Sequence, residues 1–446
     1  MSTKFQHLRQ HFISHQVFEA LQPLFFITFL YGLTPFRVTT NKGGEKSIKM
    51  STFGFINIAL YILLYGSCYV ISLLREESVA GYFFRNKISD VGNTMQICNG
   101  LITGTVIYIS AVTQRSKMLR VIATLHNLDK NFANIGIKVK YSRIYRFSIV
   151  MLTFKSLVIG VYFMGVYRLL MSMNITPSFT VCVTFFLQHS VLFLAICLFC
   201  FVARSFERRL VILNKVLKNL RHQWETRSIK TISHKQKSLQ CLDSFSMYTI
   251  VSKNPCDVIQ ESMEIHQLIC EAASTANKYF TYQLLTIISI AFLIIVFDAY
   301  YVLETLLGKT KRESKFKTIE FVTFFSCQMI LYLIAIISIV EGSNRAIKKS
   351  EKTGSIVHAL LNKAKSPDVK EKLQQFSMQL LHLKISFTAA GLFNIDRSLY
   401  FTISGALTTY LIILLQFTTN SSPALSSDCT LNSPGLPPIP INFTSN

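Results

Sequence analysis

The 446-residue chain is half hydrophobic, contains 36 phenylalanines and has only 15% charged residues. A soluble domain of this size needs no such excess of apolar side chains, so the composition predicts a membrane protein. The formal net charge of +23 is spread over the loops between apolar runs and is not gathered on one soluble domain. It therefore indicates contact with anionic membrane lipids and argues against nucleic acid as a partner.

The first apolar run, residues 17–36, contains Pro23, Gly32 and Pro35. These helix breakers predict an amphipathic helix that lies at the membrane interface or re-enters the membrane without spanning it. Seven longer runs follow, each of about 20 residues, which is the length that crosses a bilayer. They cover 52–73, 91–112, 147–169, 179–203, 281–304, 320–341 and 399–419. We therefore expect an all-α membrane protein with seven transmembrane helices.

Lysine and arginine counts distinguish the two sides of this protein. The loops 204–278 and 342–398 contain twelve and ten of these residues, whereas the loop 170–178 and the tail after 419 contain none. Five basic residues in 305–319 run against the trend. The positive-inside rule then places the N-terminus in the cytosol and the C-terminus outside the cell.

Glycosylation triplets support the same orientation. Asn-x-Ser/Thr occurs at Asn174, Asn420 and Asn442, and all three fall on the side predicted to be external. Asn420 lies too close to the predicted bilayer to be modified. Asn174 and Asn442 are therefore the predicted glycosylation sites.

Two cytosolic segments have the apolar period of helices that continue from or lead into spans. In 204–221 the apolar face consists of Leu210, Leu213, Val216, Leu217 and Leu220. A second helix begins at Ser366-Pro367-Asp368, where Ser can cap and Pro suits the first helical position. Its apolar stripe continues through Leu383 to Phe387, toward the last span. These segments predict an intracellular helical layer, partly between subunits.

The predicted organisation has five parts. They are a cytosolic N-terminal segment (1–51), transmembrane helices one to six with a ligand pocket in their outer half (52–341), a cytosolic helical anchor (342–398), a pore-lining seventh helix (399–419) and a disordered extracellular tail (420–446).

The seventh span contains one small and polar face. Thr402, Gly405, Thr409, Ile413 and Gln416 are separated by 3, 4, 4 and 3 positions, so they lie on one side of a helix. A small-residue contact with another helix and a pore-lining stripe both explain this face. The amide of Gln416 needs polar partners within the membrane, which favours the pore. No acidic residue occurs on the stripe, so tight ion selectivity is not expected.

The outer halves of spans two to six combine aromatic walls with a few polar groups, which is the composition of a small-molecule pocket. Asp298 is the sharpest candidate, because an ionisable side chain in a span is costly and marks function. Ordinary packing is the alternative for each aromatic residue taken singly. The candidate ligand residues are Tyr162, Tyr167, Phe186, Gln188, His189, Asp298, Tyr300, Tyr301, Phe324, Phe325 and Gln328, with Asn93, Gln96 and Asn99 as further polar groups at this depth.

The end of the seventh span also resembles a family signature. Thr409-Tyr410, five apolar residues and Gln416-Phe417 form the pattern found in the last helix of insect gustatory receptors. Most of the chain from about 220 to 419 is similar to the 28b branch of the fly receptors. The segments that show this likeness include 223–227, 238–245, 297–301 and 389–396.

The resemblance implies a homotetrameric, ligand-gated, non-selective cation channel in the plasma membrane of sensory neurons. It places the seventh span around a central pore, with Gln416 and Phe417 at the gate. It further implies small-molecule tastants as ligands, monovalent and calcium cations as permeant ions, and membrane lipids and other gustatory receptors as partners. Heat or light are stimuli associated with this branch.

Other function classes find less support in the sequence. A G-protein-coupled receptor runs in the opposite orientation, and no Asp-Arg-Tyr follows the third span. A secondary transporter of small polar molecules is the alternative that remains, although no inverted repeat is visible. We expect no enzyme activity, cofactor or metal site, because no catalytic constellation occurs at recognisable spacing.

Overall fold

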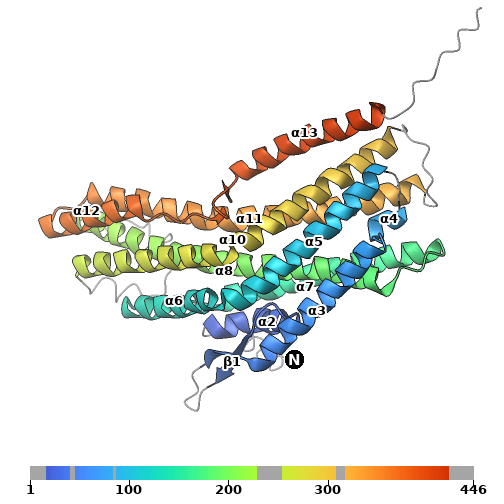
Figure 1. Ribbon diagram of the computed structural model, residues 1–446. Helices are drawn as coiled ribbons and strands as arrows, with labels where there is room; N and C mark the ends of the chain where they lie inside the picture. Colours follow the sequence, from blue (N-terminus) through green and yellow to red (C-terminus); the bar gives the residue numbers. More distant parts are fainter. Residues whose placement is uncertain (1–16, 41–45, 84–86, 229–253, 308–316, 421–446) are drawn as a thin grey trace, which may run out of the picture.

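The computed structural model describes residues 17–40, 46–83, 87–228, 254–307 and 317–420 (Figure 1). Within these ranges, seven helices have the length and hydropathy to cross a membrane. They are α3 (Thr52–Leu74), α5 (Lys87–Thr113), α7 (Ser142–Ser172), α8 (Phe179–Ser228), α10 (Pro255–Leu306), α11 (Thr318–Leu361) and α13 (Ser398–Asn420). The predicted all-α, seven-span fold is confirmed, and each predicted span lies within one of these helices.

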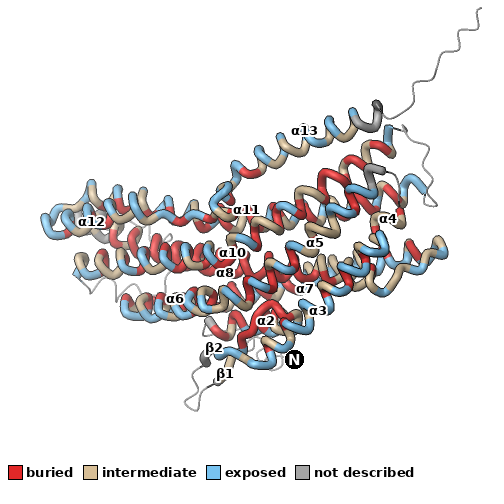
Figure 2. The backbone as a smooth tube through the Cα atoms, viewed as in Figure 1, coloured by how far each residue is buried: buried red, intermediate tan, exposed pale blue. Residues whose placement is uncertain are grey.

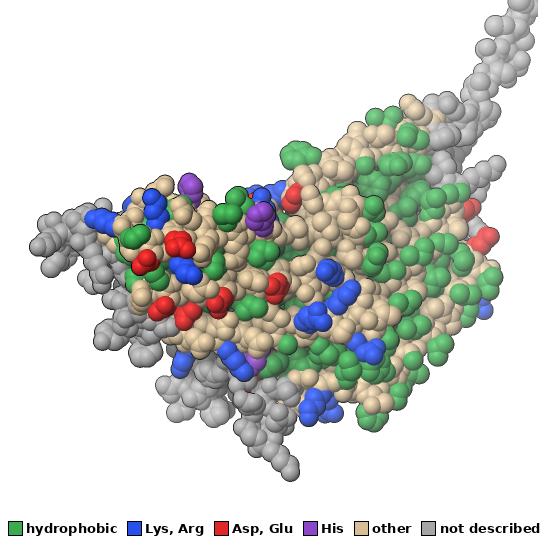
Figure 3. All heavy atoms as spheres, turned by 60° about the vertical axis from the view of Figure 1, so that its left-hand side comes forward, with side chains coloured by type: hydrophobic (Ala, Val, Ile, Leu, Met, Phe, Trp, Pro, Cys, Tyr) green, Lys and Arg blue, Asp and Glu red, His purple; other side chains and the backbone are tan. Residues whose placement is uncertain are grey.

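Three of the spanning helices, with 50, 52 and 44 residues, are much longer than the roughly 20 residues that cross a bilayer. The extensions of α8, α10 and α11 pack with α6 (Arg115–Asn134) and α12 (Pro367–His382) into a helical layer at one end of the bundle (Figure 1). Charged side chains gather over this end in Figure 3, and hydrophobic side chains cover the other half of the visible face. The division fits a molecule that lies partly in lipid and partly in water.

Helix α8 forms the centre of the bundle. In the most hydrophobic 18-residue stretch of α8, 83% of the residues are buried, whereas only 6% are buried in the corresponding stretch of α13. Figure 2 shows the same contrast between a largely buried α8 and an α13 that is mostly exposed or intermediate. The leucine and valine face predicted for 204–221 is fully inside. This confirms a helix that leaves the membrane and packs within the helical layer.

The N-terminal segment packs against the outside of this bundle. Helix α2 (Val17–Leu30) buries Leu21, Leu24 and Phe25 and contacts α7. An antiparallel hairpin of β1 (Phe36–Thr40) and β2 (Lys46–Met50) follows it. At 14 residues, α2 is shorter than a span.

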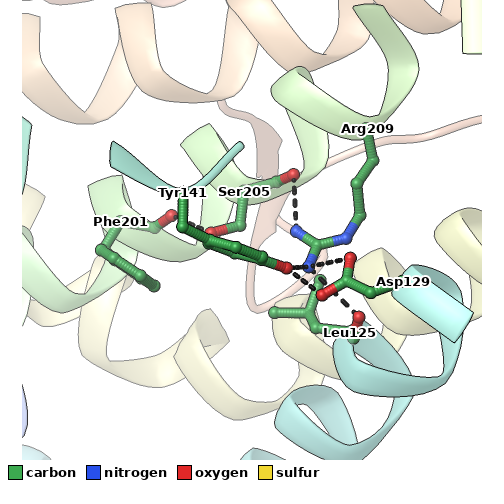
Figure 4. A network of polar contacts seen from close by, with 6 residues as sticks. All are labelled: Leu125, Asp129, Tyr141, Phe201, Ser205 and Arg209. Atoms are coloured by element: carbon green, nitrogen blue, oxygen red, sulfur yellow. Dashed lines mark hydrogen bonds and ion pairs between the residues drawn. The ribbon is translucent and has the colours of Figure 1, made fainter. Parts of the chain in front are cut away.

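A buried arginine joins three elements of the helical layer (Figure 4). Arg209 of α8 is 0% exposed, and its Nη2 donates to the Leu125 carbonyl and to Asp129 Oδ1 at 3.1 and 2.9 Å. Nη2 also donates to the Tyr141 hydroxyl at 2.6 Å, and Nη1 donates to the Ser205 carbonyl at 3.1 Å. Burial raises the pKa of Tyr141, so its hydroxyl remains protonated and donates to Asp129. The network ties α6 and the start of α7 to the central helix.

The connection to α13 differs from the prediction. Helix α12 begins at Pro367 as predicted but ends at His382, so the expected helical stripe through Leu383 and Phe387 is wrong in its second half. The chain instead forms a hairpin of β3 (Thr388–Ala389) and β4 (Phe393–Asn394). Ala390 and Gly391 adopt left-handed φ values of 50° and 74° in its turn.

Side chains of α10 provide hydrogen-bond partners for backbone groups of this hairpin. The backbone N–H of Thr388 donates to Asn277 Oδ1 at 3.0 Å, and that of Ala390 donates to Thr281 Oγ1 at 2.7 Å. Thr281 in turn donates to the Thr388 carbonyl at 3.2 Å. These bonds fix the hairpin, and with it the start of α13, on the middle of α10.

The buried network predicts a large stability difference between two ion-pair variants. Asp129→Ala leaves the Arg209 guanidinium buried without its carboxylate and should cost about 3–5 kcal/mol. Glu341→Ala, which breaks the more exposed Arg397–Glu341 pair, should lower the unfolding midpoint much less, because solvent screens this pair. The measurement is the thermal unfolding midpoint of the full-length protein in detergent. Equal shifts for both variants would show that the buried network does not hold the layer together.

Candidate functional site

A cavity of about 60 Å³ opens among α3, α5, α8, α10 and α11, together with the short helix α4 (Val79–Phe83). Three of the predicted ligand residues line it, namely Gln188 and His189 of α8 and Gln328 of α11. Asn93 and Gln96 of α5 line it as well. Residues from spans one, two, four, five and six thus meet around this cavity. A cavity of this size holds a few water molecules, so a larger ligand needs its walls to move.

Several polar atoms in this cavity lack partners among the described residues. They are Ser72 Oγ, Glu77 Oε2, Asn93 Oδ1, Gln96 Nε2 and His189 Nε2, each buried and each on a residue that lines the cavity. Buried polar groups are normally satisfied, and each exception calls for a reason. Five such atoms around one cavity indicate a place built to receive hydrogen bonds from a ligand or from water.

Hydrogen bonds hold two of the cavity side chains in place. Tyr69 donates to Gln188 Oε1 at 2.6 Å, and Gln188 Nε2 donates to the Tyr332 hydroxyl at 3.1 Å. His189 Nδ1 lies 2.7 Å from the Phe185 carbonyl, which leaves Nε2 turned away from its own helix. The amide is therefore a fixed part of the wall, whereas the imidazole has one nitrogen available.

Asp298 lies in α10, one turn beyond the cavity residue Ile294. Its side chain is 0% exposed, and neither carboxylate oxygen has a hydrogen-bond partner in the described part of the chain. Tyr162 and Tyr332 are its electrostatic neighbours. A buried carboxylate without a donor is costly, so Asp298 is an incomplete polar site beside the cavity.

An aromatic cluster lies between this polar region and α13. Phe83 stacks on Phe324 with ring centroids 4.1 Å apart, and Tyr301 lies 5.0 Å from Phe325. Tyr300 belongs to the same buried cluster. Leu411, Leu414 and Leu415 of α13 pack against it. The cluster therefore forms a continuous packed connection between the cavity walls and the last helix.

Helix α13 packs through one side and leaves the predicted stripe uncovered. Thr402, Gly405, Thr409, Ile413 and Gln416 are all exposed. A Cβ added at Gly405 would meet nothing within 4 Å. Within the described residues, the stripe therefore makes no small-residue contact with another helix of this chain. Phe417 lies in α13, but its side chain is outside the described residues.

The base of α13 is tied to two other spans. The Arg397 guanidinium donates to both carboxylate oxygens of Glu341 in α11, at 2.9 and 3.1 Å. Asp396 Oδ1 accepts from the Ser398 backbone N–H at 2.8 Å, next to the hairpin that is fixed on α10. Higher along the helix, Tyr410 meets Phe292 of α10 with ring centroids 5.9 Å apart. Contacts with α10 and α11 therefore hold α13 and the residues just before it.

Comparison with known proteins shows to which family this chain is related. The sequence model of a family described as 7tm chemosensory receptor matches residues 21–421. The chain belongs to this family. Gustatory receptor 28b of Drosophila melanogaster is 61% identical over 93% of this chain and 88% of its own length. Gustatory receptor 28a of the same species is 35% identical over 93% of this chain and 95% of its own length. The chemosensory receptor is thus a multi-pass membrane protein, and its predicted likeness to insect gustatory receptors is confirmed.

A solved receptor structure has the same fold. The insect olfactory receptor OR5 from Machilis hrabei covers 93% of this chain and 100% of its own, with a TM-score of 0.60 and 13% identity. Its complex with eugenol gives a TM-score of 0.54. The likeness confirms the fold of the seven-helix chemosensory receptor.

The remaining predicted residues of the receptor lie in different surroundings. Tyr162 does not line the cavity, but its hydroxyl donates to Oε1 of the lining residue Gln328 at 3.3 Å. Tyr167 is 39% exposed on α7, and Phe186 contacts Phe163 outside the cavity. Asn174 is exposed in the turn between α7 and α8, and Asn442 falls outside the described residues.

Sequence reasoning missed Ser72 and Glu77 as cavity residues of the receptor. Ser72 reads as an ordinary small residue of span one, and Glu77 reads as part of a charged loop. The left-handed φ of 52° at Glu76 turns the chain at this point, so that Glu77 and α4 line the cavity. The two acidic residues Glu76 and Glu77 directly after a span were the sequence feature from which this role could have been predicted.

Substitution of Asp298 tests whether the receptor uses this polar region. Asp298→Asn keeps the side-chain volume but removes the carboxylate, so an agonist that is held by it should lose at least about tenfold in potency. Tyr167→Phe, a change at a position outside the cavity, serves as the control and should leave potency unchanged. Calcium entry is measured at matched surface expression. Unchanged potency in Asp298→Asn would remove this residue from the ligand site.

Proposed function

We propose that the receptor is a ligand-gated, non-selective cation channel in the plasma membrane of sensory neurons. Four copies would surround one axis, with α13 of each copy lining the pore. Small-molecule tastants would act from the outer cavity, and monovalent and calcium cations would pass. The resemblance extends the stimuli to heat or light and the assembly to other gustatory receptors.

The uncovered stripe of α13 is the observation that carries this proposal. Its polar and small side chains face neither the bundle nor another helix of the same chain, and hydrocarbon offers no partner for the amide of Gln416. Thr402 and Thr409 donate to carbonyls of their own helix, so they tolerate either lipid or water. A water-filled path between copies satisfies the amide and keeps the apolar face of α13 against the aromatic cluster.

Packing between the cavity and α13 supports the gating step. A ligand that enters the cavity must push apart walls that include Gln328 of α11, one turn from Phe324 and Phe325. Those rings belong to the cluster on which Leu411 and Leu414 rest. Packed side chains move in discrete rearrangements, so expansion of the cavity shifts α13 relative to the pore axis.

The chemistry of the cavity favours a ligand with an aromatic or aliphatic body and a few polar groups. Eugenol, which is bound in the olfactory receptor structure of the same fold, is a molecule of this kind. The absence of acidic residues from the α13 stripe supports weak ion selectivity, because cation-selective pores commonly use acidic rings.

Substitutions at the outer end of α13 test the proposal. Phe417→Ala should remove an apolar constriction and produce current without stimulus. Gln416→Leu should reduce the stimulated current without changing agonist potency, because ions lose an amide that replaces part of their hydration. Phe401→Ala serves as the control: it truncates the same side-chain type at an exposed position on another side of α13. Whole-cell recording in a non-sensory cell with sodium, potassium and calcium solutions gives the readout.

One outcome would count against a channel, and another would count against Phe417 as its constriction. A transporter would move substrate without a sustained current, and its transport would saturate at the slow rate of a conformational cycle. Constitutive current in Phe401→Ala but not in Phe417→Ala would place the constriction elsewhere on the helix.

A further inference from the structure

A basic groove of about 600 Å³ lies along α7 where this helix enters the helical layer. Arg143 and Arg146 of α7 and Arg208 of α8 line one end, and Val150, Met151 and Phe154 line the other. Only 11% of the residues in the most hydrophobic 18-residue stretch of α7 are buried, so this helix lies at the periphery of the bundle. Neither the cavity nor the α13 stripe includes this groove.

The groove changes from charged to apolar along a single helix face. Arg143, Arg146, Val150 and Phe154 are spaced by 3, 4 and 4 positions, which places them in one row. The row spans roughly 16 Å at the rise of an α-helix. A phospholipid has the same order of chemistry along its length, with a charged headgroup at the membrane surface and hydrocarbon below it.

The charged end has a surplus of cations. Arg208 Nε is buried and has no hydrogen-bond partner within the described ranges. Glu207, the acidic residue next to it, is already paired with Arg204. Arg204 also lies over the Phe147 ring, with its guanidinium carbon 5.5 Å from the ring centroid. Among the described residues, this end of the groove therefore has more guanidinium groups than acidic groups, which suits phosphate.

The apolar end leads into a second cavity. Phe154 and Lys155 line both the groove and a mainly apolar cavity of about 100 Å³ between α7, α8 and α11. Lys155 Nζ sits 4.8 Å from the centroid of the Phe193 ring. His189 lines this cavity and also the polar cavity of the candidate ligand site. An acyl chain that follows Phe154 therefore ends beside the ligand site.

We propose that this groove binds an anionic phospholipid with a multiply phosphorylated headgroup. Arg143, Arg146 and Arg208 hold the phosphates, and one acyl chain lies along Val150 and Phe154. In the orientation predicted from the basic loops, the groove faces the inner leaflet, which contains the anionic lipids of the cell.

Lipid titration of the full-length protein tests the charged end. Native mass spectrometry in detergent with dioleoyl phosphatidylinositol bisphosphate should show one tightly bound lipid per chain. Arg143→Gln combined with Arg146→Gln should weaken binding at least about tenfold, because each basic side chain at the headgroup contributes to affinity. Arg120→Gln combined with Lys130→Gln removes the same charge from exposed positions on α6 and should change affinity less than about twofold.

A second variant separates a lipid from a soluble polyanion. Val150→Trp fills the apolar end without altering charge, so it should weaken lipid binding but leave binding of inositol trisphosphate unchanged. Inositol trisphosphate, which has the phosphates without the acyl chains, should bind the unmodified protein more weakly than the lipid. If it binds equally well, or if Val150→Trp has no effect on the lipid, the groove is a site for soluble anions.

Cross-linking of the unmodified protein gives a readout that does not depend on the folding of variants. A photoreactive bisphosphorylated phosphoinositide should label α7 between Arg143 and Phe154. Labelling confined to other helices, absence of lipid binding, or equal losses in the two double variants would each overturn the proposal.

Discussion

The constraint that governs this receptor is that a spanning helix cannot leave a side-chain amide without polar partners in hydrocarbon. Helix α13 presents Gln416 in a row with small and polar residues, and the described part of the chain leaves this row uncovered. In the proposed channel, water or another copy of the chain covers this side. The opposite side of α13 is half-buried and packs against the aromatic cluster through Leu411, Leu414 and Leu415.

The other elements of the receptor position α13 for this role. The hairpin between α12 and α13 is fixed on α10, Arg397 pairs with Glu341 of α11, and the aromatic cluster supports the apolar side of α13. Below the membrane, Arg209 locks α8 to α6 and α7, so the layer is a firm base. In the proposed gating step, α13 would shift relative to this base.

Sequence alone predicted the features that follow from local periodicity. The seven spans, the buried leucine face after span four and the single-sided stripe of α13 all repeat at helical spacing. Helix α6 was not predicted although its apolar period is present, because its segment is polar on average. The hairpin could not be predicted, since its partners Asn277 and Thr281 lie 111 and 109 positions away from the groups that they bind. Part of the cavity lining was predicted, because the position of a residue along a span indicates its depth in the membrane. The turn at Glu76, which brings Glu77 and α4 to the cavity, could not be predicted from the sequence.

Cysteine accessibility along α13 tests the pore most directly. Single cysteines at Thr402, Thr409 and Ile413 should react with small water-soluble thiol reagents, and mainly during stimulation, because these positions face the water-filled path. Cysteines at Leu411 and Leu414, which pack toward the aromatic cluster, should stay unreactive. Reactivity without a helical period, or confined to Leu411 and Leu414, would show that the stripe is a packing surface and that the pore lies elsewhere.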